Sequence, residues 1–127
     1  MNSHTNLWTR VTDMQQLYLA YQRARHCKRK SPAMATLAYD LESQLAKLQR
    51  ELFNGNYKPA GYHCFSITDP KPRKIYAAAF RDRIVHHSLV AAIEPIFDRA
   101  MITESYACRT GKGTHAALRA LDHHWRA

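Results

Sequence analysis

The stretch PKPRKI, residues 70–75, sets cationic side chains beside two prolines. Lysine is a mobile point charge and arginine a planar fork that matches phosphate oxygens, so Lys71 and Arg73 could hold a triphosphate. Proline limits the freedom of the unfolded turn, which would pre-order these donors. The alternative interpretation is an ordinary solvated turn.

A second cationic group, Arg81 and Arg83, flanks Asp82 at the expected start of a helix. An acidic residue in the first turn is stabilised by the helix dipole, and Asp82 could also hold one arginine in place for phosphate contact. The alternative is a surface ion pair, which contributes only about 0–1 kcal/mol.

The glycine-bearing stretch RTGKGT, residues 109–114, has part of the composition of a phosphate-binding loop. The Walker pattern fails, because Tyr106 stands where a glycine is required and Gly113 where Ser or Thr should follow Lys112. A basic glycine turn before a helix can still contact phosphate through backbone N–H groups.

Residues suited to metal chemistry are scattered. No Tyr-x-Asp-Asp, Asp-x-Asp, His-Glu-x-x-His or Cys-x-x-Cys pattern occurs, so no pair of carboxylates is set to hold two metal ions. His86–His87 and His123–His124 are adjacent pairs, and adjacent side chains on a helix diverge by about 100°. We therefore expect neither a catalytic residue nor a metal site in this chain.

Composition narrows the class of partner. The 127 residues, 46% of them hydrophobic, suit a single domain. Nineteen Lys and Arg against ten Asp and Glu give a net charge of +9, which favours a polyanionic partner. The densest basic run, RARHCKRK at 23–30, is either a nucleic-acid-facing surface or a helix end where cations suit the dipole. Without a spanning apolar run or a signal peptide, the sequence predicts a cytoplasmic protein with no membrane partner.

Several elements must position these residues. The capping-box spacing from Thr12 to Gln15 predicts a helix over about 13–28. A second helix starts at Ser31-Pro32, ends at Gly55 and carries one leucine stripe: Leu37, Leu41, Leu45, Leu48 and Leu52.

The second half of the chain mixes strand and helix patterns. Residues 62–79 predict a β-hairpin whose tip carries Asp69, Lys71 and Arg73. A third helix begins at Phe80 or Arg81 and stops before Pro95. Thr114 can cap a last helix, HAALRALDHHWRA, which lacks a C-cap and so suggests truncation. The third helix should turn these residues inward: Ile84, Val85, Leu89 and Ile93. The predicted fold class is α+β, with helices packed around a β-hairpin.

Four motifs in order, PKPRKI, FRDRIVHHSL, IEPIF and ESYACRTGKGTHAAL, resemble the N-terminal fingers region of bacterial reverse transcriptases. The nearest types are group II intron-like enzymes and those of diversity-generating retroelements, and the resemblance covers roughly residues 12–127. It implies a right-hand polymerase fold, truncated before the catalytic strands of the palm. The chain would be one partial domain, with N-terminal helices at 1–56 and the start of the reverse transcriptase domain at 57–127.

The resemblance also implies roles and partners. The expected partners are an RNA template, a DNA or RNA primer and a deoxynucleoside triphosphate (dNTP). The implied dNTP-binding residues are Lys71, Arg73 and Lys74. The implied nucleic-acid-binding residues are Arg81, Arg83, Arg109, Lys112 and Thr114.

In family members, three aspartates bind two Mg²⁺ ions, and this chain lacks their motifs. We therefore expect it to bind no Mg²⁺ and to be inactive alone as a nucleotidyltransferase. One alternative is a stand-alone, non-catalytic RNA-binding module of a retroelement. Another is a module that docks on a retroelement accessory protein.

Overall fold

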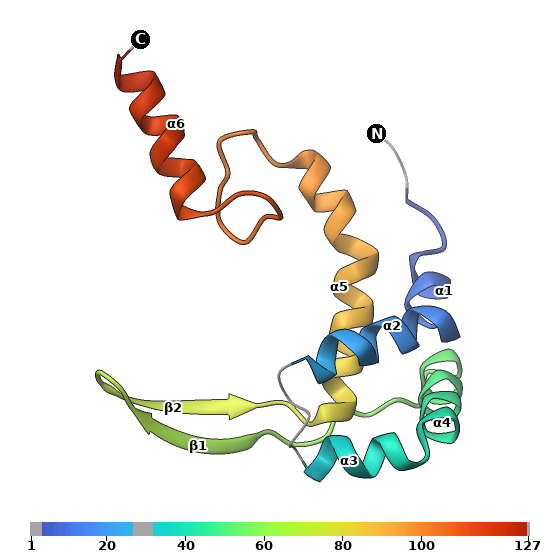
Figure 1. Ribbon diagram of the computed structural model, residues 1–127. Coiled ribbons are helices and arrows are strands. Elements are labelled where there is room, and N and C mark those ends of the chain that lie inside the picture. The colour runs from blue at the N-terminus through green and yellow to red at the C-terminus, as the bar shows by residue number, and fades with distance from the viewer. Residues whose placement is uncertain (1–3, 27–31, 127) are drawn as a thin grey trace. The chain divides into compact units, whose positions relative to one another are not determined.

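The computed structural model describes residues 4–26 and 32–126 (Figure 1). The chain divides into two compact units, Met1–Ala92 and Ile93–Ala127. The first unit holds α1 (Leu7–Val11), α2 (Met14–Arg25), α3 (Pro32–Tyr39), α4 (Leu41–Phe53), β1 (His63–Thr68) and β2 (Pro72–Ala77). The boundary between the units falls inside α5 (Phe80–Ala100), and α6 (Thr114–Arg126) belongs to the second unit. The predicted α+β class is confirmed.

The core of the first unit is helical. Leucines of α4 spaced by three and four residues pack with α2 and the start of α5, as expected of helix faces. Tyr21 of α2 meets Phe80 of α5 edge to face, with ring centroids 6.2 Å apart. The fully buried side chains in this core include Leu17, Leu48, Leu52 and Ile84, each contributing about 1.5–3 kcal/mol by burial.

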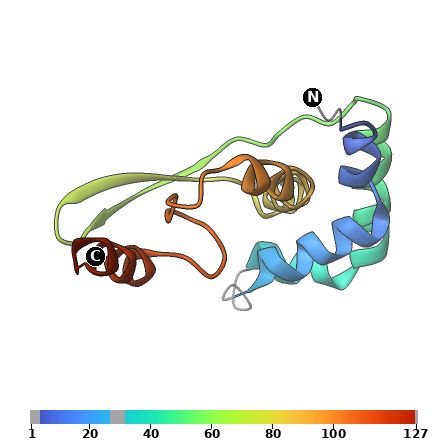
Figure 2. The ribbon, with the colours of Figure 1, turned by 90° about the horizontal axis from the view of Figure 1, so that it is seen from above.

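The hairpin lies outside this core. Every residue of β1 is exposed, and the residues of β2 are exposed or half-buried. The prediction that the helices pack around the hairpin is therefore wrong, because the helices pack on one another. The two strands pair antiparallel from His63 opposite Ala77 to Thr68 opposite Pro72, forming the two-stranded ribbon seen in Figures 1 and 2. The hairpin prediction itself is confirmed.

The start of α2 differs from the prediction by one residue. The Asp13 carboxylate, not the Thr12 hydroxyl, caps the helix by accepting the Gln16 N–H at 3.0 Å. Thr12 instead ends α1, where its hydroxyl donates to the Trp8 carbonyl at 3.1 Å. The helix ends at Arg25; residues 27–30 of the basic run and the predicted Ser31 cap lie outside the described residues.

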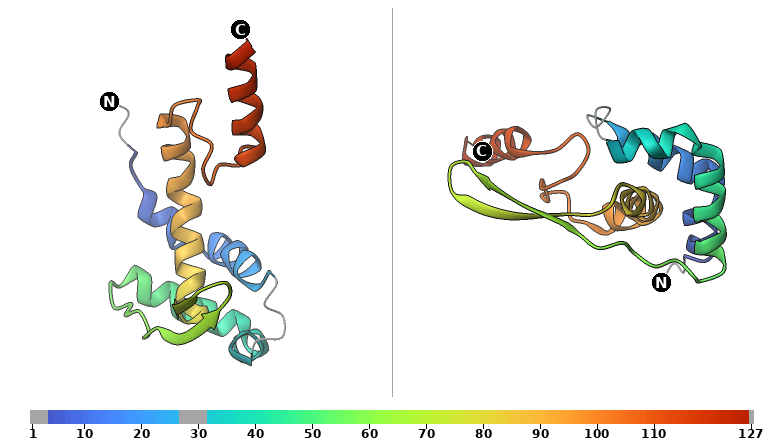
Figure 3. Two further views of the ribbon diagram at one scale, coloured as in Figure 1. Left: turned by 90° about the vertical axis from the view of Figure 1, so that its left-hand side faces the viewer. Right: turned by 90° about the horizontal axis from the view of Figure 1, so that it is seen from below.

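The helix predicted from Pro32 to Gly55 is two helices. Asp40, with φ −131° and ψ 54°, breaks it between α3 and α4, which run in different directions (Figures 2 and 3). The predicted end at Gly55 is confirmed. Gly55 has φ +69°, its N–H donates to Leu52 at 3.3 Å, and the Asn56 N–H donates to Glu51 at 2.9 Å, which together form a Schellman motif.

The predicted stop before Pro95 is wrong, because α5 continues to Ala100. Proline removes the hydrogen bond that its own N–H would have donated, and its ring crowds the carbonyl four residues earlier. The helix nevertheless continues, and the Met101 N–H donates to the Phe97 carbonyl at 3.0 Å. Ile84 and Val85 are buried as predicted, whereas Leu89 is 40% exposed. Thr114, predicted to cap the last helix, is instead the first residue of α6. No helix of the described residues is long and apolar enough to cross a membrane.

Candidate nucleic-acid interface

The tip of the hairpin carries three exposed cations. Lys71 lies in the connection between the strands, and Arg73 and Lys74 lie on β2. No described residue forms an ion pair or a side-chain hydrogen bond with any of them. Their donors are therefore available to an external anion.

The register places Arg73 and Lys74 on opposite faces of the hairpin, because successive side chains of a strand alternate. Arg73 pairs with Ile67 and shares its face with Phe65, and both of these apolar side chains are exposed. Lys74 pairs with Ser66 and shares its face with Tyr76, which is 63% exposed. The three residues predicted to bind dNTP thus do not form one cluster: the two faces each offer one cation beside an exposed apolar or aromatic side chain.

Asp82 anchors the segment that leads into β1. Its side chain is 2% exposed; it accepts the Tyr57 hydroxyl at 2.6 Å and the Ala60 N–H at 2.8 Å. Burial, and then Asp82, raise the pKa of the Tyr57 phenol well above its ordinary value. The predicted role of Asp82 in holding an arginine is replaced by a role in fixing the base of the hairpin.

Arg81 completes this anchor. Its guanidinium pairs with the Glu51 carboxylate and lies 5.3 Å from the centre of the Tyr57 ring. The Glu51 carbonyl also accepts the N–H groups of Asn56 and Tyr57 at 2.9 and 3.1 Å. Arg81 therefore makes intrachain contacts that join α4, the connection to β1 and α5; its nucleic-acid role stays a prediction.

Arg83 is positioned differently. Its guanidinium lies 5.8 Å from the Phe80 ring centre, and its Nε is buried without a hydrogen-bond acceptor from the described residues. His87 stands one turn further along α5. Burial lowers the pKa of His87, and the positive charges of Arg23 and Arg83 and the neighbouring His86 lower it further.

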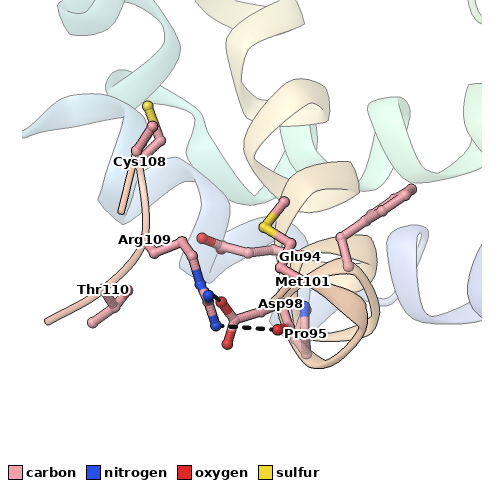
Figure 4. Close-up of a pocket in the computed structure, with 9 residues that line it drawn as sticks. Glu94, Pro95, Asp98, Met101, Cys108, Arg109 and Thr110 are labelled. Carbon is pink, nitrogen blue, oxygen red and sulfur yellow. Dashed lines mark hydrogen bonds and ion pairs between the residues drawn. The ribbon is translucent and has the colours of Figure 1, made fainter. Parts of the chain in front are cut away.

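Two residues predicted to bind nucleic acid, Arg109 and Lys112, form hydrogen bonds within the second unit. Arg109 reaches from the loop to the end of α5 (Figure 4), where its Nε donates to the Asp98 carboxylate at 2.7 Å. The remaining guanidinium nitrogens donate to the carbonyls of Asp98, Ile102 and Ser105. With only 13% of its side chain exposed, Arg109 stabilises the loop that follows α5.

Lys112 donates to the Thr103 carbonyl, and its Nζ lies 5.3 Å from the Tyr106 ring centre. Thr114 is the exposed first residue of α6. Nucleic-acid binding by these two residues and by Arg109 stays a prediction. Of the three, only Thr114 makes no side-chain hydrogen bond, ion pair or ring contact with another described residue.

Residues that could ligate a metal do not converge in the described parts of the chain. No group of three His, Cys, Asp or Glu side chains lies close enough to hold an ion there. That this chain binds no Mg²⁺ by itself stays a prediction.

Comparison with known proteins adds one similarity. No protein-family model matches the sequence. The chain is 33% identical over 94 residues to Protein YkfC of Escherichia coli strain K12, an alignment covering 72% of this chain and 24% of that protein. The chain thus matches about a quarter of the length of this curated relative.

Proposed function

We propose that this chain contributes template and incoming-dNTP binding to an RNA-directed DNA polymerase, as the fingers part of a right-hand fold. The observation that carries the proposal is the exposed hairpin with three cations, Lys71, Arg73 and Lys74, that no described residue neutralises. The order of motifs that resembles reverse transcriptases supports the same function.

The chemistry of the hairpin suits nucleotides. Asp69 is the one acidic residue among residues 63–77, against Lys71, Arg73 and Lys74. Phosphate oxygens accept charge-assisted hydrogen bonds from lysine and arginine, and exposed aromatic side chains offer surfaces on which bases stack. Phe65 and Tyr76 provide such a surface on each face of the hairpin.

A rigid base allows the cations to act at a defined place. Asp82 accepts hydrogen bonds from Tyr57 and Ala60, just before β1, and Arg81 lies over the Tyr57 ring. Binding groups held on a supported element lose less conformational entropy when a ligand binds. Asp82 and Arg81 therefore support the base of the hairpin that carries these cations.

The test is equilibrium binding of a fluorescent dNTP and of a labelled single-stranded RNA to the full chain. Arg73→Gln should weaken dNTP binding about tenfold, because a hydrogen bond to a charged group contributes about 1.5–3 kcal/mol. Arg10→Gln, which removes the same charge from an exposed position on α1, is the matched control and should change little.

Equal affinities of the wild type and Arg73→Gln for both ligands would overturn the proposal. RNA binding that depends on Arg73, without measurable dNTP binding, would instead indicate the non-catalytic RNA-binding module.

A further inference from the structure

A groove lies in the first unit, between the start of α2 and the break that separates α3 from α4. Its volume of about 1090 Å³ is slightly above the usual range for ligand sites, about 300–1,000 Å³, so it can take several side chains at once. The apolar and aromatic residues that line it are Met14, Tyr18, Tyr39, Leu41 and Leu45.

The apolar wall of the groove is accessible and held in place by the core. Leu45 is buried among the core residues of this unit. The Tyr18 hydroxyl accepts a hydrogen bond from the Gln22 side chain at 2.7 Å, and the Tyr18 ring lies 6.3 Å from the ring of Tyr21, a core residue. Tyr39, at the end of α3, is 95% exposed. Exposed apolar side chains gathered along a groove are typical of an interaction site.

The polar residues of the groove are acidic or neutral: Asp13, Gln15, Asp40 and Glu42. Asp13 uses one carboxylate oxygen to cap α2, whereas Asp40 stands at the N-cap position of α4 and makes no capping hydrogen bond. No described cation forms an ion pair with any of the three carboxylates. The helix dipole favours an acidic residue at each helix start, but it does not account for the exposed aromatic rings beside them. The groove is thus an acidic and aromatic surface on a chain with a net charge of +9.

We propose that this groove docks a basic segment of a partner protein, in which lysine or arginine residues alternate with apolar ones. Charge complementarity selects this occupant, because the carboxylates accept charge-assisted hydrogen bonds from cationic side chains. Tyr39 offers a ring face for a cation–π contact, and the apolar side chains of the segment pack against Met14 and Leu41. The same carboxylates repel phosphate groups, so this surface is separate from nucleic-acid binding and the inference does not rest on the proposed function.

The test is fluorescence anisotropy of a labelled short peptide of alternating arginine and leucine, titrated with the full chain. Asp40→Asn combined with Glu42→Gln should weaken binding about fivefold, because two exposed ion pairs of modest strength are lost. Asparagine caps helices as well as aspartate does, so the break before α4 should persist. The matched control is Asp69→Asn combined with Glu104→Gln, two exposed acidic residues away from the groove, and it should change little.

A second variant tests the aromatic wall. Tyr39→Ala should weaken binding of the same peptide about threefold, because an exposed cation–π contact is modest. Alanine is favourable in a helix, so the fold should be kept, and circular dichroism checks this. Tyr62→Ala is the control, since Tyr62 is also an exposed tyrosine and does not line the groove.

Equal affinities of the wild type and the Asp40→Asn, Glu42→Gln variant for the arginine peptide would overturn the proposal. So would equally tight binding of a peptide of alternating glutamate and leucine, or of serine and leucine. A dimer in sedimentation velocity that this variant loses would assign the groove to a second copy of the chain and overturn the partner segment. The variant should keep wild-type affinity for RNA and dNTP, and Arg73→Gln should keep wild-type affinity for the arginine peptide, so this inference and the proposed function can fail separately.

Discussion

The Asp82 carboxylate should be the most sensitive side chain for the placement of the hairpin. Asp82→Ala removes the acceptor for the Tyr57 hydroxyl and for the Ala60 N–H. Hydrogen bonds to charged groups contribute about 1.5–3 kcal/mol each, and the half-buried position of Tyr57 favours the lower end for its bond. We expect the free energy of unfolding to fall by about 3 kcal/mol, measured by urea denaturation followed by circular dichroism.

A double-mutant cycle separates the two bonds. Tyr57→Phe alone should cost about 1–1.5 kcal/mol, and in the Asp82→Ala background it should cost almost nothing, because its acceptor is already absent. Tyr62→Phe is the matched control, since Tyr62 is 67% exposed and should be neutral. Asp82→Asn keeps an acceptor for the Ala60 N–H and should be milder than Asp82→Ala. An Asp82→Ala effect below about 0.5 kcal/mol, within the range of ordinary surface substitutions, would refute the reasoning.

Three further predictions concern pH, backbone and catalysis. The pKa of His87 is lowered in the folded chain, so the unfolded chain binds more protons. The free energy of unfolding should therefore fall as the pH drops below about 6.5, the ordinary pKa of histidine. His87→Gln should flatten this dependence, measured by urea denaturation at several pH values. Gly55 has φ +69° and open space where a Cβ would lie, so Gly55→Ala should cost about 1 kcal/mol through its backbone alone, and a neutral effect in the same urea assay would contradict the Schellman motif. Primer extension by the purified chain with Mg²⁺ should give no product above a protein-free control, and Mg²⁺-dependent incorporation would show that the expected inactivity is wrong.

Local sequence rules predicted the elements better than their ends. Leucine spacing located α4, and Gly55 marked its end, because a positive φ favours glycine. Thr12 and Asp13 are both good caps, so sequence alone could not decide which residue starts α2. The residue at the break between α3 and α4 is Asp40, which is neither glycine nor proline, so the local sequence does not predict the break.

For the candidate site too, some features could be predicted from the sequence and others could not. The cations of the hairpin tip followed from local composition, and the opposite faces of Arg73 and Lys74 could have been predicted from their adjacency in a strand. The contacts of Arg81 could not have been predicted from the sequence. Its partner Glu51 is thirty residues away along the chain and reaches Arg81 only through tertiary packing. Arg109 shows the same limit, since a basic glycine turn gives no sign that its arginine binds the carbonyls of its own loop.

The salt dependence of dNTP binding tests the central claim most directly. With Lys71, Arg73 and Lys74 available to the triphosphate, the affinity of the wild type for a labelled dNTP should fall as the salt concentration rises, because salt screens the attraction between exposed charges. Replacing all three by Gln should remove most of this dependence. The control carries Arg10→Gln, Lys47→Gln and Arg50→Gln, three exposed positions on α1 and α4, and should keep the wild-type salt dependence. Equal salt dependence for the two triple variants, or wild-type dNTP binding that does not respond to salt, would contradict a phosphate-binding hairpin.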